Sequence, residues 1–198
     1  MPSAPDPDHG SAISRWEKIS SERIADCRVF RVNRNEFRHP RRDISNNFFV
    51  LDSPDWVHAI ARTTDDQLVL VNQFRFGTVD FSLEVPGGLI ESGEDPVAAG
   101  RRELLEETGY GGGQAVVLAR IRPNPAIQDN WCHIVLLEGV RLVAPLKWDE
   151  HEEIETRVLP IPEVLNLARQ GVLQHSLTLA ALFFFEPIWR KAASTPAV

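Results

Sequence analysis

The sequence has few cysteines, and they show no spacing typical of a metal or redox site. Its 198 residues include only Cys27 and Cys132, which are far apart and outside any C-x-x-C pattern. We therefore expect reduced thiols, as in a cytoplasmic protein, and no disulfide framework. A chain of this length can bury roughly 70% of its extended surface, so it needs neither a metal nor a disulfide in order to fold.

Long apolar runs and a net positive charge are also missing. The longest apolar run, 177–185, is far shorter than the ~20 residues of a membrane-spanning helix and predicts a buried helix instead. The first ten residues contain three prolines and no apolar stretch, unlike a signal peptide. With 28 acidic and 21 basic side chains, the net charge is −7. No broad basic surface is expected for a nucleic-acid polymer or a membrane, although a bound metal could still recruit a nucleotide.

Composition and turn residues divide the chain into three parts. Residues 1–12 are rich in Pro, Asp and Ser and indicate a disordered leader. A turn cluster begins at Asp52, so we place a small β subdomain at 13–51 and the main domain at 52–198. Within the subdomain, strands are predicted over 28–33 and 48–51, with Phe30, Phe48 and Phe49 in the core.

The main domain alternates strand-like and helix-like segments. Strands are predicted over 56–61, 67–72, 82–85, 116–121, 133–137 and 154–159, and a turn at 86–88. Helices are predicted over 96–108, 162–169 and 177–191. The first has clear end signals, because Asp95 suits the N-cap, Pro96 the first position and Gly109 the stop. Strands on both sides of the helices predict an α/β fold with a mixed sheet and helices on both faces.

Three glutamates project from one side of the predicted helix at 96–108. Glu103, Glu106 and Glu107 are three or four residues apart, which places their Cβ atoms within about 6 Å. Like charges at this spacing are destabilising, so an arginine or a metal should offset them; Arg102 could pair with Glu106. Mg²⁺ favours a few carboxylates together with substrate phosphates. The pattern predicts a metal-assisted site for a phosphorylated substrate, and the alternative is a solvated acidic face.

The segment 88–110 resembles the Nudix hydrolase box, G-x5-E-x7-R-E-U-x-E-E-x-G-U, where U is apolar or aromatic. Every defined position is filled, by Gly88, Glu94, Arg102, Glu103, Leu104, Glu106, Glu107, Gly109 and Tyr110. A chance match has a probability on the order of one in a million. The resemblance implies a Nudix α/β/α sandwich with a mixed sheet, and hydrolysis of a nucleoside diphosphate linked to another group.

The same resemblance implies roles for individual residues. The implied metal ligands are Glu103, Glu106, Glu107 and the carbonyl of Gly87. Arg102 would orient the glutamates, and Glu94 would assist indirectly. The implied cofactor is Mg²⁺, with Mn²⁺ as a substitute; it would neutralise phosphate charge and lower the pKa of the attacking water.

The flanking residues resemble the branch that hydrolyses ADP-ribose and nucleotide sugars. Segments 73–75 and 84–88 match Q-[FY]-R and E-x-P-[AG]-G. Arg75 would then contact the diphosphate, and Glu84 the substrate or a metal-bound water. Asn72 departs from the branch, which usually has Arg or Lys there, so one cationic contact is missing. For ADP-ribose the products would be AMP and ribose 5-phosphate, and GDP-mannose or another nucleotide sugar is the alternative substrate.

More distant segments extend this resemblance. Pro125 lies 15 residues after Tyr110, as in members directed to ADP-ribose, although it could be an ordinary loop proline. The acidic loop after Trp148 resembles an element that supplies the general base, with Glu150 the first candidate and Glu152 the second. The alternative for this loop is a solvated run of charge. One aromatic residue is expected to stack the base, and the candidates are Trp16, Phe37, Trp56 and Phe81.

In the same branch an N-terminal β subdomain supports dimer formation, so residues 13–51 imply a homodimer. Other pyrophosphate substrates remain open: a dinucleotide, coenzyme A or capped RNA, although the acidic balance argues against long RNA. A non-catalytic ligand sensor of the same fold is a further alternative. Sensors of this kind usually lose box glutamates, and this sequence keeps all of them.

Overall fold

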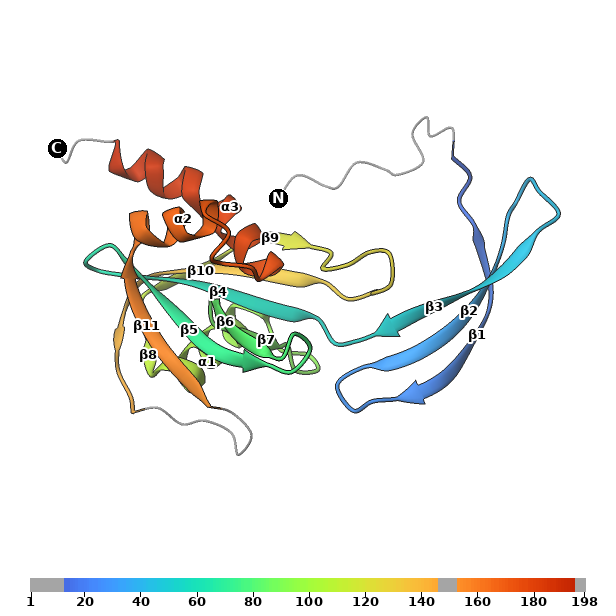
Figure 1. Cartoon of the computed structure of the whole chain (residues 1–198), viewed down its shortest axis with the longest axis horizontal. Coiled ribbons are helices and arrows are strands. Elements are labelled where there is room, and N and C mark those ends of the chain that lie inside the picture. The colour runs from blue at the N-terminus through green and yellow to red at the C-terminus, as the bar shows by residue number, and fades with distance from the viewer. Residues whose placement is uncertain (1–12, 146–152, 195–198) are drawn as a thin grey trace. The chain divides into compact units, whose positions relative to one another are not determined.

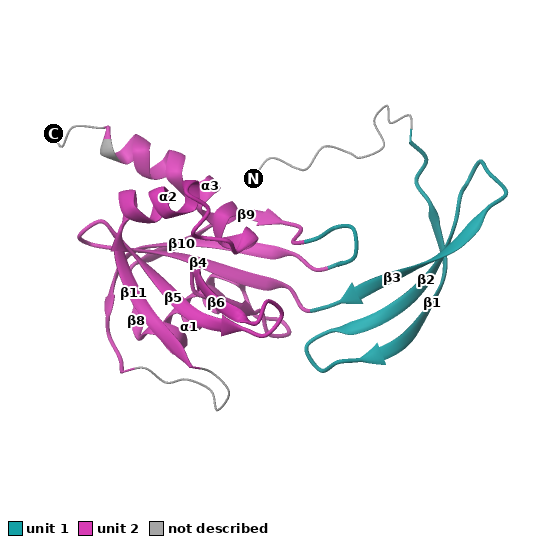
Figure 2. Ribbon diagram, viewed as in Figure 1, with its two compact units in different colours: residues 1–53, 124–129 teal, residues 54–123, 130–198 magenta. Residues whose placement is uncertain are grey.

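The structure is a computed structural model that describes residues 13–145 and 153–194 (Figure 1). The chain divides into two compact units (Figure 2). The first contains residues 1–53 and 124–129, and the second contains residues 54–123 and 130–198.

The first unit is a three-stranded antiparallel sheet with the order β1-β2-β3. Its strands are β1 (Glu17–Asp26), β2 (Arg31–Arg38) and β3 (Ser45–Asp52). The loop 124–129 joins this unit at Leu51, whose backbone N–H donates to the carbonyl of Ile127 at 2.7 Å. The sequence does not mark β1, because polar residues dominate it and most of its side chains are exposed.

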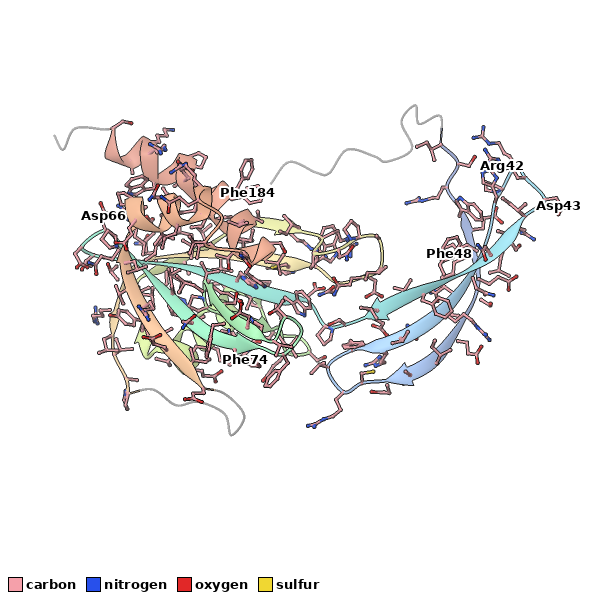
Figure 3. The ribbon with its side chains drawn as sticks, viewed as in Figure 1. Arg42, Asp43, Phe48, Asp66, Phe74 and Phe184 are labelled. Atoms are coloured by element: carbon pink, nitrogen blue, oxygen red, sulfur yellow. The ribbon has the colours of Figure 1, made fainter. Side chains whose placement is uncertain are left out.

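Two predictions for this unit are wrong. The strand expected over 28–33 begins at Arg31, because residue 28 adopts a left-handed backbone conformation with φ 66°. Phe48, labelled in Figure 3, and Phe49 were expected in a core, but their exposed fractions are 42% and 56%. The described residues of this unit form only the three strands and loops, and so small a sheet offers little apolar surface in which to bury them.

The second unit is built on an eight-stranded mixed sheet. Its central path is β11-β5-β4-β10-β8, with β6 paired to β5, β7 to β4 and β9 to β10. The strands are β4 (Trp56–Thr63), β5 (Gln67–Arg75), β6 (Asp80–Glu84), β7 (Gly87–Leu89), β8 (Tyr110–Gly111), β9 (Gln114–Ile121), β10 (Cys132–Leu142) and β11 (Ile154–Pro160). Only the β4–β10 pair is parallel among the pairings of the described strands in this sheet.

Helices cover both faces of this sheet, which confirms the predicted α/β/α layers (Figure 1). α1 (Pro96–Thr108) packs on one face, and α2 (Ile161–Arg169) and α3 (Ser176–Ala193) pack on the other. Each face of the sheet has its own hydrophobic core, and successive residues of β4 point into different ones. Ala59 lies in the core with α1, and Ile60 lies in the core with α3. Central strands are therefore apolar on both sides and appear as continuous apolar runs in the sequence.

The helices lie where the sequence predicts them. The apolar run 177–185 lies in α3, where Leu182 and Phe185 are buried against the sheet. None of the described helices is both long and apolar enough to cross a bilayer. Gly100 sits in the middle of α1, where a Cβ would lie only 3.3 Å from side-chain atoms of Val57 and Val135. The glycine therefore allows the helix to approach the sheet closely.

Candidate active site

Both ends of α1 are fixed by local contacts, as predicted. The Asp95 side chain accepts hydrogen bonds from the backbone N–H groups of Val97 and Ala98 at 2.9 and 3.2 Å. At the other end Gly109 adopts φ 72°, and its N–H donates to the carbonyl of Leu105. These caps stabilise the helix and fix which of its residues face β7.

Arg102 is the cation that offsets the acidic side of α1. Its Nε and Nη2 donate to the two carboxylate oxygens of Glu94 at 3.0 and 2.9 Å. Its Nη1 donates to Glu103 at 2.8 Å and to Glu106 at 3.3 Å, which confirms the predicted pairing with Glu106. The hydrogen bonds from Arg102 lower the pKa of Glu94, and those to Glu94 raise the pKa of Arg102. One guanidinium thereby orients three carboxylates.

Two consecutive glycines of β7 lie against the carboxylates of Glu103 and Glu107. The Gly87 N–H donates to Glu107 Oε2 at 3.0 Å. A Cβ on Gly88 would lie 2.5 Å from Glu103 Oε1, so only glycine leaves room for this carboxylate. The turn predicted over 86–88 is wrong for these two residues, which pair with β4 as a strand. The glycine pair therefore brings the backbone of β7 next to two of the box carboxylates.

Arg75 and Glu84 form a second ion pair in the same unit. Arg75 Nε and Nη2 donate to the Glu84 carboxylate at 2.8 and 2.6 Å. The Glu84 side chain is fully buried, whereas 42% of the Arg75 side chain is exposed. Burial alone would raise the pKa of Glu84, but the hydrogen bonds and charge of Arg75 outweigh it, and the net pKa is lowered. Glu84 is therefore an ionised carboxylate held away from solvent.

Two stacked histidines lie beside this ion pair, and the sequence analysis did not identify them. The rings of His58 and His175 are 5.2 Å apart and nearly parallel, at 11°. His58 pairs with Gly87 in the β4–β7 register. Burial lowers the pKa of both histidines, that of His58 to about 3. A single histidine in a strand and another before a helix carry no spacing signal that could have revealed the pair.

Comparison with known proteins identifies the family. The model of the NUDIX domain matches residues 54–181. The chain belongs to the Nudix family. Among its relatives, an ADP-ribose pyrophosphatase of Bacillus subtilis is 26% identical over 86% of this chain and 89% of its own. A methanol dehydrogenase activator of Bacillus methanolicus is 28% identical over 85% and 91% of the two chains. The crystal structure of an ADP compounds hydrolase superposes with a TM-score of 0.80 at 22% identity, and covers 93% of this chain and 98% of that one.

The protein is thus a Nudix hydrolase related to ADP-ribose pyrophosphatases, an enzyme class that uses divalent metal ions. Within the described residues, no three His, Cys, Asp or Glu side chains already form a metal-binding cluster. Mg²⁺ does not require one, because it retains waters and takes only one or two carboxylates along with substrate phosphates. The donors present are hard oxygens: Glu103 and Glu107 beside β7, and Glu106, whose side chain is 50% exposed. This donor chemistry fits a hard divalent cation.

The other predicted site residues fall in several places. Asn72 donates to Glu155 at 3.2 Å. Pro125 lies in the loop grouped with the first unit, and its role stays a prediction. Glu150 and Glu152 lie outside the described residues. Of the candidate base-stacking aromatics, Trp16 and Phe37 contact Phe48, and Trp56 is half-buried in β4. Phe81 is 70% exposed, and its ring contacts that of Phe74.

Proposed function

We propose that this Nudix hydrolase cleaves the diphosphate bond of a nucleoside diphosphate sugar with the help of Mg²⁺, for which Mn²⁺ can substitute. ADP-ribose is the first candidate; water adds across the bond, and AMP and ribose 5-phosphate leave. The observation that carries the proposal is the arrangement of the box carboxylates: Arg102 holds Glu94, Glu103 and Glu106, and the backbone N–H of Gly87 in β7 holds Glu107. The name of the Bacillus subtilis relative supports ADP-ribose. GDP-mannose or another nucleotide sugar is the alternative, because Asn72 replaces a cationic residue.

Under this proposal the residues of α1 and β7 form the metal site. Glu103, Glu106, Glu107 and the Gly87 carbonyl would hold the cation, and Arg102 keeps Glu103 and Glu106 in place. When bound, the cation would neutralise charge on the diphosphate and make water a better nucleophile. The Gly87 N–H restrains one oxygen of Glu107, so this carboxylate is oriented before substrate arrives.

Residues outside α1 would bind substrate and move protons. Arg75 would contact the diphosphate, because its side chain is partly exposed and carries a fixed positive charge. Pro125 would contribute to the recognition of ADP-ribose. Glu150, or else Glu152, would accept a proton from the attacking water.

The proposal includes a homodimer formed through the subdomain 13–51, preceded by a leader at 1–12. The small sheet exposes large apolar side chains, including Ile19, Ile24 and Phe49, at 46%, 47% and 56%. Burial of such side chains is favourable, so a second copy would stabilise the sheet. A cytoplasmic location is also proposed, because both cysteines are free. Analytical ultracentrifugation of the whole chain and of a chain beginning at residue 52 tests the dimer, and a monomeric whole chain contradicts it.

A product assay tests the activity. ADP-ribose, GDP-mannose and other nucleotide sugars are incubated with the protein and Mg²⁺, with Mn²⁺, or with a chelator, and the nucleoside monophosphate is quantified. We expect turnover only with a divalent cation. Glu107→Gln should lower kcat at least about a hundredfold and retain nucleotide binding, because the amide keeps the size of the side chain but ligates a hard cation poorly.

Glu138→Gln is the matched control, because Glu138 is 48% exposed and pairs with Arg62 on another part of the sheet. It should retain wild-type turnover. A folded wild-type protein that hydrolyses none of these compounds would refute the proposal and favour a non-hydrolytic role. Unchanged turnover in Glu107→Gln would refute the role of Glu107 alone.

A further inference from the structure

Arg75 is held by a mostly buried cluster whose hydrogen bonds involve none of the carboxylates of α1. The cluster combines residues from four elements: Arg75 at the end of β5, Glu84 at the end of β6, His58 in β4, and His175 at the N-cap of α3. Nothing in the Nudix box specifies these contacts, since all four residues lie outside the box at 88–110. Glu84 and His175 are therefore two charged or titratable side chains of this cluster with no role in the box.

Glu84 does not present its carboxylate to solvent. Its side chain is fully buried, and each of its oxygens accepts a hydrogen bond from Arg75. A buried carboxylate is strongly unfavourable without partners, so this bidentate pairing is what makes the position tolerable. Arg75 lies between the buried Glu84 and solvent: one side of its guanidinium contacts Glu84, and 42% of its side chain is exposed. Of the two residues, only Arg75 can reach a substrate while the pair stays intact.

His175 connects this ion pair to α3. Its Nδ1 lies 3.5 Å from Glu84 Oε2 and 3.2 Å from the hydroxyl oxygen of Thr178. Thr178 is fully buried, and its hydroxyl oxygen also accepts a hydrogen bond from the Val85 N–H at 3.2 Å, directly after Glu84 in the chain. The first turn of α3 is thus fastened to the end of β6 through two side chains.

The ring of His175 is itself confined by His58. The two rings stack at 5.2 Å, and His58 lies opposite Gly87 in the sheet. Burial lowers the pKa of both histidines, so neutral rings can stack without repulsion near neutral pH. The stack limits where the imidazole of His175 can move, and with it the carboxylate that it faces.

We propose that Glu84 and His175 are positioning residues that hold the guanidinium of Arg75 toward the substrate diphosphate, and that neither touches the substrate itself. This inference rests on the proposed function and differs from the direct substrate contact that the family resemblance implied for Glu84. His175 stabilises the orientation of Glu84, and Glu84 fixes two of the nitrogens of Arg75. A cation held in advance binds the diphosphate without first losing side-chain freedom.

Steady-state kinetics with a nucleotide sugar tests the proposal through variants Glu84→Gln, His175→Ala and His175→Gln. We expect His175→Ala and Glu84→Gln to raise KM about tenfold while kcat changes less than about threefold, because a charge-assisted binding contact is weakened. His175→Gln should recover part of the loss, since its amide can also face the Glu84 carboxylate. His133→Gln is the matched control, because His133 contacts Asp55 outside the cluster, and its KM should equal that of the wild type.

A double-mutant cycle shows whether His175 acts through Arg75. In an Arg75→Ala background, His175→Ala should change KM less than about twofold further. Full additivity of the two effects would overturn the proposal. So would variants whose thermal midpoint falls while KM stays at the wild-type value, because that result is expected of a purely structural role.

A measurement without substrate separates this inference from the proposed function. In ¹H–¹⁵N spectra, the Nε–H signal of Arg75, assigned with Arg75→Lys, should shift in Glu84→Gln and in His175→Ala but not in His133→Gln. If the wild type hydrolyses no nucleotide sugar but the signal shifts as expected, the proposed function fails and the positioning of Arg75 stands. If turnover is normal and the signal is unchanged in both variants, the positioning proposal fails.

Discussion

Gly88→Ala is expected to remove activity without unfolding the protein. The new Cβ would lie 2.5 Å from Glu103 Oε1 and 2.6 Å from the carboxylate carbon. Because ordinary carbon contacts lie at roughly 3.5 Å, the carboxylate must move by about 1 Å. The end of a flexible side chain can make this move, so the fold tolerates it. Misplacement of a reacting group by about 1 Å can cost roughly a hundredfold in rate.

The effect of Gly88→Ala on stability should be small. Displacement weakens the partly exposed Arg102–Glu103 pair, which is worth about 0–1 kcal/mol. Replacing glycine offsets this loss by about 0.4–1 kcal/mol through the unfolded chain. We therefore expect kcat/KM to fall about a hundredfold and the thermal midpoint to stay within about 4 °C of the wild type.

Two other glycines, Gly87 and Gly77, provide the comparison. A Cβ on Gly87 would lie 2.2 Å from the backbone carbonyl oxygen of Val57, which cannot rotate away. Gly87→Ala should therefore cost about 3 kcal/mol and lower the thermal midpoint by roughly 6–12 °C. In Gly77→Ala the new Cβ meets no atom within 4 Å, so kcat/KM and the thermal midpoint should both stay at the wild-type values. Calorimetry and initial rates of all three variants decide the matter: wild-type kcat/KM in Gly88→Ala would refute the reasoning.

Two further predictions concern charge. Arg102→Lys should lower kcat/KM about a hundredfold, because a single ammonium group cannot replace the guanidinium contacts to Glu94, Glu103 and Glu106; wild-type rates in this variant would contradict the orienting role. His58→Phe should reduce the loss of stability in acid. The pKa of His58 is about 3 in the folded protein against 6.5 in the unfolded chain, so the unfolded state takes up the proton first and wild-type stability falls as the pH drops from 6.5 toward 3. The free energy of unfolding by urea is measured from about pH 7 to pH 4 for both proteins. Its slope against pH should be smaller in the variant, and the two slopes should differ by at most about 1.4 kcal/mol per pH unit. Parallel curves would refute the lowered pKa of His58.

Local signals account for what could be predicted about α1. Its ends follow from Asp95, Pro96 and Gly109, because capping involves residues within one turn of each other. The common side of the three glutamates follows from helix periodicity. The burial of β4, β5 and β10 on both faces follows from their continuous apolar runs, because such runs are typical of strands that are covered on both sides.

Contacts between distant segments account for what was missed. The strand character of Gly87–Leu89 depends on pairing with β4, about 30 residues earlier in the chain, and glycines carry no strand propensity of their own. The pairing of Arg75 with Glu84 requires the register of the β5–β6 hairpin. The stacked histidines come from β4 and α3, more than 100 residues apart in the sequence.

The amino-acid sequence by itself determined the family, the glutamate-rich helix α1 and the layered architecture, because each depends on residue spacing along short, continuous segments of the chain. Only the tertiary structure decided which partner each charge has. Arg102 donates hydrogen bonds to three carboxylates, whereas Arg75 pairs with a buried glutamate beside two histidines. Charge pairing depends on distances of a few ångströms between segments, and the packing of the sheet sets these distances.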